Sequence, residues 1–275
     1  MPETRSAQTA WMPVEGPLGS IRAGRGPRLV FVHGFTQTGR SWLPVAEQFV
    51  ADHEIVLVDM PGHGRSGHVR ADLRLGADLL AAVGGRATYI GYSMGGRFVL
   101  HLALAYPHLV RSMALLGATG GISNDDERNA RRAADENLAE QIETSGVDAF
   151  LEKWLALPLF ATLPEYAKNL DDRASNTADG LANSLRLAGT GSQLPLWERV
   201  GHIAEPALVM AGELDVKFSD LGRQLADAIG DNAIYRPIHD AGHAAHLEHP
   251  FAVVSAIRQW LTANRQNPSA TSALR

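Results

Sequence analysis

The chain has 275 residues, of which 45% are hydrophobic and 20% are charged, and its formal net charge is −5. This composition is ordinary for a globular protein, and the length fits one large domain or a core with an insertion. The absence of cysteine excludes disulfides, thiolate nucleophiles and cysteine-ligated metal sites. The negative charge argues against a nucleic-acid binder, because such proteins usually carry a basic surface.

We expect neither a leader sequence nor a membrane span. The first residues, MPETRSAQTAW, lack the apolar stretch of a signal peptide, and no run approaches the roughly 18 apolar residues that a membrane helix needs. We therefore expect a cytoplasmic protein. The last residues, 267–272, read Asn-Pro-Ser-Ala-Thr-Ser and are typical of a frayed tail.

The first third of the chain alternates short apolar runs with helical patterns. The apolar runs stop at or beside glycine or aspartate, which is typical of strands buried on both faces of a sheet. This alternation predicts a parallel sheet with helices on both faces. The predicted strands are residues 29–32, 55–58, 87–90 and 112–116, and the predicted helices include residues 41–50 and 96–105.

The alternation stops after residue 120 and returns near residue 207. Between them we find no good strand pattern, and the segment is predicted to be helical. Strands are expected again at 207–210 and 233–235, and a last helix at 250–264. We therefore predict an α/β fold with a mostly parallel central sheet, whose core is residues 1–120 and 197–275 and whose helical cap is residues 121–196. The helices expected in the cap are residues 126–143, 147–155, 164–168 and 179–187.

A possible nucleophile follows the third predicted strand. Gly91-Tyr92-Ser93-Met94-Gly95 is a G-x-S-x-G sequence that follows a strand and opens a helix, the context of a nucleophile elbow. A serine hydroxyl needs a histidine that is oriented by a carboxylate, and in this fold the chain order is serine, acid, histidine. We assign Ser93, Asp215 and His243. Glu213 is the competing acid, but it lies nearer the end of its strand.

Two backbone N–H groups are candidates for an oxyanion hole. One belongs to Met94, the residue after the nucleophile, and the other to Phe35, in the loop after the first long strand. His33, two residues before Phe35, is interpreted as a structural residue.

No metal or cofactor is expected. His239, His243, His246 and His249 are spaced like helical metal ligands, but the H-E-x-x-H signature is absent and Asp240-Ala241-Gly242 favours a loop. We interpret His246 and His249 as residues at the entry of a helix. The glycine motifs of nucleotide-binding proteins are also absent.

Three arginines are candidates for binding an anionic substrate. Arg97 lies four residues after Ser93 on the same helix face. Arg131 lies on the apolar stripe of its predicted helix and therefore needs an anion from the protein or from a ligand. Arg173 is a third candidate, although Asp171 and Asp172 could neutralise it locally. Because arginine binds carboxylates through two parallel hydrogen bonds, convergence of the three on Ser93 would indicate a small substrate with several carboxylates.

These residues together resemble a known family. The core resembles the α/β-hydrolase superfamily, and residues 30–260 are similar to 2-succinyl-6-hydroxy-2,4-cyclohexadiene-1-carboxylate synthase, a family of menaquinone biosynthesis. The stretches in the cap are the more specific ones, since caps diverge quickly between families. The matching stretches are His33-Gly34-Phe35-Thr36, Asp59-Met60-Pro61-Gly62-His63-Gly64, Gly95-Gly96-Arg97, Glu127-Arg128 through Asp135, Trp154 through Phe160, Gly189-Thr190-Gly191-Ser192-Gln193, Leu196-Trp197 and Gly212 through Phe218.

The resemblance implies a triad of Ser93, Asp215 and His243. It also implies carboxylate binding by the three arginines, and a pocket wall that includes Tyr92, Trp154 and Phe160. The implied reaction is a lyase step without a cofactor: a proton is abstracted from a cyclohexene substrate and pyruvate is eliminated.

In this reaction Ser93 would act as the base after activation by His243, and the oxyanion donors would stabilise the developing enolate. The sequence departs from the family at Thr119-Gly120-Gly121-Ile122, where Pro-Gly-Leu is common. We therefore make no assignment of contacts at that turn.

Two other functions compete with the lyase. A serine carboxylesterase or related acyl hydrolase would use the same triad, because one fold supports many chemistries. A non-catalytic ligand receptor is disfavoured by the intact triad. The arginines favour the lyase, and the expected partner is a small-molecule polycarboxylate, not a nucleic acid or a membrane.

Overall fold

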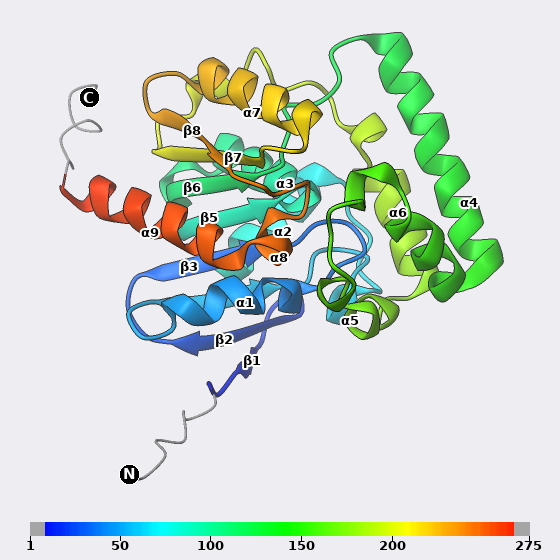
Figure 1. Cartoon of the computed structure of the whole chain (residues 1–275), viewed down its shortest axis with the longest axis horizontal. Coiled ribbons are helices and arrows are strands. Elements are labelled where there is room, and N and C mark those ends of the chain that lie inside the picture. The colour runs from blue at the N-terminus through cyan, green and yellow to red at the C-terminus, as the bar shows by residue number, and fades with distance from the viewer. Residues whose placement is uncertain (1–8, 267–275) are drawn as a thin grey trace.

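The computed structural model describes residues 9–266, so the frayed tail expected at 267–272 lies outside the described residues. An eight-stranded sheet forms the centre of the molecule, in the order β1-β2-β4-β3-β5-β6-β7-β8 (Figure 1). The pairs from β3 to β8 are parallel, whereas β1 and β2 pair antiparallel. The strands are β1 (Met12–Val14), β2 (Ser20–Gly24), β3 (Arg28–Val32), β4 (Glu54–Val58), β5 (Ala87–Tyr92), β6 (Val110–Leu116), β7 (Ala207–Gly212) and β8 (Ala233–Ile238).

The six parallel strands are the six that the apolar runs predict. The prediction missed β1 and β2, because β2 carries Arg22 and three small residues where a hydrophobic pattern would be expected. β2 is held instead by its antiparallel register with β4, in which Ser20 lies opposite Val58 and Gly24 lies opposite Glu54.

Helices cover both faces of the sheet, and alternate residues of each strand supply the two cores. In β3, Val30 and Val32 face one core, whereas Leu29 and Phe31 face the other, as strand geometry requires. Figure 1 shows α1 and α9 crossing one face. One core packs against α2 (Leu73–Gly84), α3 (Met94–Ala105) and α7 (Val216–Ile229), and the other against α1 (Leu43–Ala46), α8 (Ala245–Glu248) and α9 (Pro250–Gln266).

Residues 121–196, which we call the helical insertion, contain helices and no strand. The longest helix is α4 (Asp125–Leu155), followed by α5 (Leu170–Ala174) and α6 (Ala178–Ala188). Gly146 has φ 80° and ψ 169°, so it interrupts α4 where the sequence predicts a break between two helices. The prediction was wrong at 164–168, where only a three-residue 3-10 helix forms at Glu165–Ala167.

The helical insertion has a small core of its own, formed where α4 packs on α6. Its division from residues 1–120 and 197–275 as a separate cap stays a prediction. Within residues 9–266, no helix combines the length and apolar character needed to cross a bilayer.

Two buried histidines join the loop after β3 to the loop after β4. His33 Nε2 accepts a hydrogen bond from Met60 N–H at 2.9 Å, and its Nδ1 donates to the carbonyl of Gly34 at 2.8 Å. His63 Nε2 accepts from Thr36 N–H at 3.2 Å, and its Nδ1 donates to the carbonyl of Pro61 at 3.0 Å. Each ring must therefore be neutral, since one of its nitrogens accepts a hydrogen bond and so carries no proton. Burial accordingly lowers the pKa of His33 to about 4 and that of His63 well below its ordinary value.

We predict that these histidines make the free energy of unfolding depend on pH. Unfolded histidine has a pKa of about 6.5, so between that value and the folded value of His33 the unfolded chain binds more protons. The stabilisation by the neutral rings is fully present above about pH 6.5 and is lost as the pH falls toward 4. Each such histidine contributes a limiting slope of about 1.4 kcal/mol per pH unit.

Urea unfolding between about pH 7 and pH 4.5 measures this slope. His33→Gln is expected to be less stable than the wild type at neutral pH but to lose less free energy on acidification. The control is His239→Gln, at an exposed position, which should keep the wild-type slope. A His33→Gln slope equal to that of the wild type would contradict the interpretation.

Candidate active site

Ser93 sits in a strained turn between β5 and α3. Its φ is 50°, a left-handed value that non-glycine residues rarely adopt. The turn is held by a hydrogen bond from Ser93 N–H to the carbonyl of Leu116 at 2.8 Å. A Cβ at Gly95 would lie 2.2 Å from the carbonyl oxygen of Val32, and one at Gly91 would lie 2.7 Å from that of Gly95. The two motif glycines are therefore required by close approach of the backbone.

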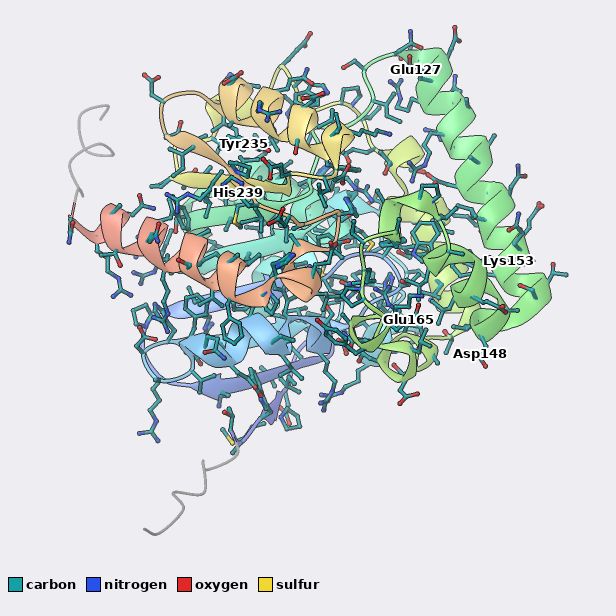
Figure 2. The ribbon with its side chains drawn as sticks, in the orientation of Figure 1. Glu127, Asp148, Lys153, Glu165, Tyr235 and His239 are labelled. Carbon is teal, nitrogen blue, oxygen red and sulfur yellow. The ribbon has the colours of Figure 1, made fainter. Side chains whose placement is uncertain are left out.

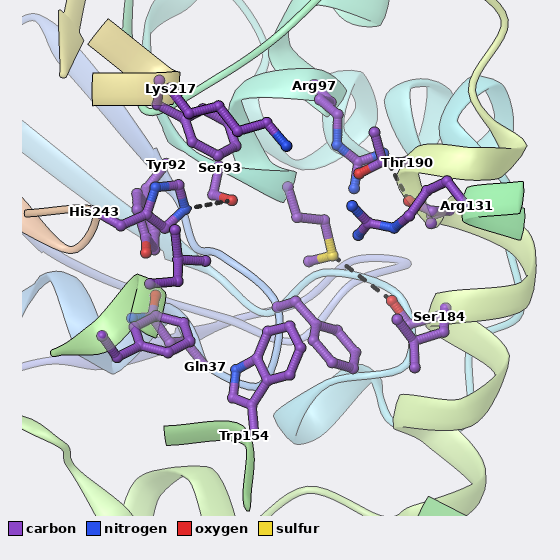
Figure 3. A pocket seen from close by; sticks show the side chains of 18 of the residues that line it. Gln37, Tyr92, Ser93, Arg97, Arg131, Trp154, Ser184, Thr190, Lys217 and His243 are labelled. Atoms are coloured by element: carbon purple, nitrogen blue, oxygen red, sulfur yellow. Dashed lines mark hydrogen bonds between the residues drawn. The ribbon is translucent and has the colours of Figure 1, made fainter. Parts of the chain in front are cut away.

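The structure brings Ser93, Asp215 and His243 into one hydrogen-bonded chain. His243 Nδ1 donates to Asp215 Oδ2 at 2.7 Å, which leaves Nε2 as the acceptor for the Ser93 hydroxyl at 3.2 Å (Figure 3). The side chains of His243 and Asp215 are 3% and 8% exposed. This geometry permits proton transfer from the serine to the imidazole.

Glu213, the competing acid, lies outside this chain. Its carboxylate contacts His239 at 3.2 Å, where both side chains are exposed. Asp215 is held by a second contact, because Oδ1 accepts from Phe218 N–H at 3.2 Å and caps α7.

A carboxylate that the sequence analysis missed holds the loop of His243. Glu248 Oε2 accepts from Gly242 N–H at 2.7 Å, and Oε1 accepts from Ala244 N–H at 3.0 Å. The two bonds bracket the backbone of His243. Glu248 is 8% exposed although it lies in a short helix, so its sequence position alone resembles that of a surface acid.

The two predicted oxyanion donors flank the pocket at Ser93. Phe35 follows β3 and Met94 is the first residue of α3, and both line the same pocket as Ser93 and His243. A first helical residue has no intrahelical acceptor for its N–H. Within the described residues, neither Phe35 N–H nor Met94 N–H donates a hydrogen bond to the protein.

The pocket beside Ser93 is a cavity of about 180 Å³ with a positively charged lining. Arg97, Arg131, Arg173 and Lys217 line it, whereas none of its lining residues is aspartate or glutamate. Figure 3 shows Arg97 and Arg131 extending into it from the side opposite His243. The apolar part of the wall includes the three aromatic residues that the family resemblance implies, Tyr92, Trp154 and Phe160.

Arg97 is buried and reaches the pocket without an ion pair. It is 6% exposed, and Nη1 donates to the carbonyl of Ala188 at 2.8 Å and to Gln193 Oε1 at 3.4 Å. Both acceptors are neutral. Burial and the neighbouring charge of Arg131 lower the pKa of Arg97 to about 10, so it stays charged at neutral pH.

Arg173 is also buried, and among the described residues neither Asp171 nor Asp172 forms an ion pair with it. Asp172 accepts from the Thr38 hydroxyl at 2.7 Å and acts on Arg173 only through its longer-range charge, and Asp171 is exposed. Arg173 Nε donates to the carbonyl of Lys168 at 2.7 Å and Nη1 to the hydroxyl of Thr36, while Nη2 is buried without a partner among the described residues. Burial lowers the pKa of Arg173 to about 10.

Arg131 has a protein anion as well as a place in the pocket. Its Nε donates to Asp135 Oδ1 at 2.7 Å, and Asp135 is 1% exposed. Asp135 Oδ2 also accepts from Gly191 N–H at 3.1 Å. Asp135 lies in one of the stretches that resemble the family, but its ion pair with Arg131, one helical turn earlier, was not predicted.

The four histidines near the end of the sheet contact different partners. His243 joins Ser93 and Asp215, His239 contacts Glu213, and His249 Nε2 donates to the carbonyl of Asp240 at 3.1 Å. His246 and His249 lie at helix entries, as expected, because His246 is the second residue of α8 and His249 directly precedes α9. His246 is fully buried, with its ring centroid 4.5 Å from Trp42 and 4.3 Å from Tyr92.

Comparisons with known proteins place this chain in a family. A family model described as alpha/beta hydrolase fold matches residues 27–250. The 2-succinyl-6-hydroxy-2,4-cyclohexadiene-1-carboxylate synthase of Salmonella schwarzengrund is 32% identical over 249 residues, which cover 86% of this chain and 94% of that protein.

Two solved structures are similar to this chain in fold. MenH from S. aureus superposes with a TM-score of 0.81 at 27% identity, covering 94% of this chain and all (100%) of the other. A thermophilic esterase from Thermogutta terrifontis has a TM-score of 0.78 at 21% identity, covering 92% of this chain and 98% of the other, a likeness that shows the fold alone. The chain therefore belongs to the alpha/beta hydrolase fold family and, within it, to the family of 2-succinyl-6-hydroxy-2,4-cyclohexadiene-1-carboxylate synthases.

Proposed function

We propose that the protein is a carbon–oxygen lyase of menaquinone biosynthesis that eliminates pyruvate from a succinyl enolpyruvyl cyclohexene carboxylate. The observation that carries the proposal is the charge of the pocket beside Ser93, which has four cationic lining residues and no acidic one. Two of the arginines, Arg97 and Arg173, contact only neutral acceptors. A substrate with several carboxylates would supply the missing anions, and the family relationship supports this choice.

In the proposed mechanism, His243 Nε2 takes the hydroxyl proton of Ser93, and Ser93 Oγ abstracts a proton from a ring carbon of the substrate. The electron pair of that C–H bond forms a new C=C bond, and the C–O bond to the enolpyruvyl group breaks. The leaving oxygen keeps its electron pair, and the enolate so formed takes the proton held by His243 to give pyruvate, which restores the neutral imidazole. Asp215 stabilises the transient imidazolium of His243.

The same proposal gives roles to the backbone donors and to the aromatic wall. The N–H groups of Phe35 and Met94 stabilise negative charge that develops on the substrate oxygen during proton abstraction. Tyr92, Trp154 and Phe160 supply the apolar surface against the ring. The step uses no cofactor, and its partner is a small-molecule polycarboxylate.

A serine carboxylesterase is the second candidate. The bond from Ser93 to His243 at 3.2 Å, beside two N–H groups without protein acceptors, equally fits acyl transfer. A neutral ester, however, would leave the buried charges of Arg97 and Arg173 without an anion in the pocket. Such buried charges lower the free energy of unfolding and would not strengthen the binding of a neutral ester. The charge of the pocket therefore favours the lyase.

Replacing Arg97 is expected to separate the two reactions. A charge-assisted hydrogen bond contributes roughly 1.5–3 kcal/mol, so Arg97→Ala should lower kcat/KM for pyruvate release by about ten- to a hundredfold or more. Hydrolysis of p-nitrophenyl acetate should change little, because Ser93 and His243 remain. A coupled pyruvate assay beside the ester assay measures both.

The control is Arg223→Ala, which removes an exposed arginine of α7 that pairs with Asp220 and should leave both reactions unchanged. Equal losses of the two activities in Arg97→Ala would mean that Arg97 supports the elbow. Brisk ester turnover without detectable pyruvate from the wild type would assign the protein to the carboxylesterases.

The two candidate acids give a second test. Asp215→Asn removes the charge that orients His243 and is expected to lower kcat by about a thousandfold or more. Glu213→Gln should stay near the wild-type kcat, since Glu213 contacts His239 at the surface. Steady-state kinetics of both variants, with melting temperatures as a folding check, decide the point. A folded Asp215→Asn with near-wild-type kcat would remove Asp215 from the mechanism.

A further inference from the structure

Lys217 is a cation of the pocket that the mechanism above does not use. The chain has only three lysines, Lys153, Lys168 and Lys217. Lys168 pairs with Glu165 at the surface, and Lys153 lies on α4, away from the sheet (Figure 2). Lys217 lines the cavity beside Ser93. Within residues 9–266, no carboxylate lies within ion-pair distance of it.

The position of Lys217 in its helix is electrostatically unfavourable. It is the second residue of α7, which is capped by Asp215 and has no acidic residue in its first turn. A helix N-terminus carries partial positive charge, so a cation there lowers stability. The nearby carboxylate of Asp215 is already engaged by Phe218 N–H and by His243. The lysine therefore adds charge to a cavity that already holds three arginines.

The pocket is positively charged at two ends, and Lys217 belongs to the end with the nucleophile. Figure 3 shows its amine extending into the cavity from the side of Ser93 and His243, whereas Arg97 and Arg131 extend from the opposite side. A molecule with separate carboxylates would supply an anion to the cations of both sides, with one carboxylate close to the atoms that react with Ser93.

We propose that Lys217 binds the carboxylate of the departing α-keto acid, while Arg97 and Arg131 bind a carboxylate at the far end of the substrate. This assignment rests on the proposed lyase function and specifies how the substrate is oriented in the pocket. A lysine placed at an electrostatic cost to folding is then explained by its contribution to binding, a trade that is common at functional sites.

Calorimetric titration with pyruvate and with succinate tests the assignment without requiring turnover. In Lys217→Gln, the Kd for pyruvate should rise about tenfold, as expected for loss of one charge-assisted contact, and the Kd for succinate should stay within about twofold. In Arg131→Gln the pattern should be reversed. Lys217→Arg should retain pyruvate binding, and Lys153→Gln is the matched lysine control that should change neither Kd.

The melting temperature of the unliganded protein gives an independent readout. Lys217→Gln should melt about 1–3 °C higher than the wild type, because a cation is removed from a helix N-terminus. Lys153→Gln should not melt higher, because Lys153 lies in the last turn of α4, where a cation is favourable.

Failure of this inference is distinguishable from failure of the proposed function. A wild type that releases pyruvate from the succinyl enolpyruvyl substrate, with a Lys217→Gln variant that binds pyruvate as tightly, overturns the role of Lys217 alone. Equal weakening of pyruvate and succinate, or a lower melting temperature, also overturns it. A wild type that neither releases nor binds pyruvate overturns both.

Discussion

The turn at Ser93 is the constraint on which the rest of the site depends. A serine in the left-handed region is strained, and the sheet around it maintains that conformation. Ser93 N–H bonds to the end of β6, and Gly95 lies against the backbone at the end of β3. The nucleophile is therefore fixed to the strands on either side of β5.

The other proposed catalytic groups come from the same end of the strands. Phe35 follows β3, Asp215 follows β7 and His243 follows β8, so each comes from a loop at the carboxyl end of a parallel strand. This arrangement is general to parallel α/β sheets, which place ligands beyond the carboxyl ends of their strands. It positions the reactive groups but does not choose the reaction.

In the proposed lyase the charge of the pocket selects the substrate, and the buried charges lower the stability of the empty pocket. Arg97 and Arg173 are buried against neutral acceptors, and burial lowers the pKa of each to about 10. Only Arg131 has a carboxylate, Asp135. A pocket that keeps its cations incompletely neutralised is less stable when empty and gains more when an anionic substrate binds. We therefore interpret the incompletely neutralised charge as a feature that sacrifices stability of the empty protein and strengthens substrate binding.

Much of this could be predicted from sequence, because it depends on local pattern. Six strands were predicted from apolar runs bounded by glycine, and the break in α4 was predicted at Gly146. The elbow around Ser93 was recognised by its two glycines, for which close backbone contact leaves no room for a side chain. Asp215 and His243 followed from chain order and from strand ends.

The features that were missed depend on contacts between distant segments. β2 is defined by pairing with β4, not by a hydrophobic pattern. Asp135 and Glu248 resemble surface acids in their helices, yet both are buried because they accept backbone N–H groups from neighbouring loops. Lys217 was noted only as part of a matching stretch, since nothing in a linear sequence shows which way an exposed lysine extends.

Contacts between the helical insertion and the loop of Phe35 would connect substrate binding to the proposed chemistry. Thr36, next to Phe35, has a left-handed φ of 67° and is held at every polar group. Its N–H bonds to His63, its carbonyl accepts from Asn176 Nδ2 at 2.8 Å, and its hydroxyl accepts from Arg173. Two of these three contacts come from the insertion.

Arg173 therefore has two contacts that matter here, since it lines the pocket and also donates to the residue beside a proposed oxyanion donor. An anion bound at Nη2, which has no partner among residues 9–266, would fix the guanidinium and, through Thr36, the direction of Phe35 N–H. In an esterase, this coupling between Arg173 and Phe35 N–H would not operate, because a neutral ester supplies no anion to the arginine. In the proposed lyase, Arg173 would bind the substrate and would also hold an oxyanion donor in place through Thr36.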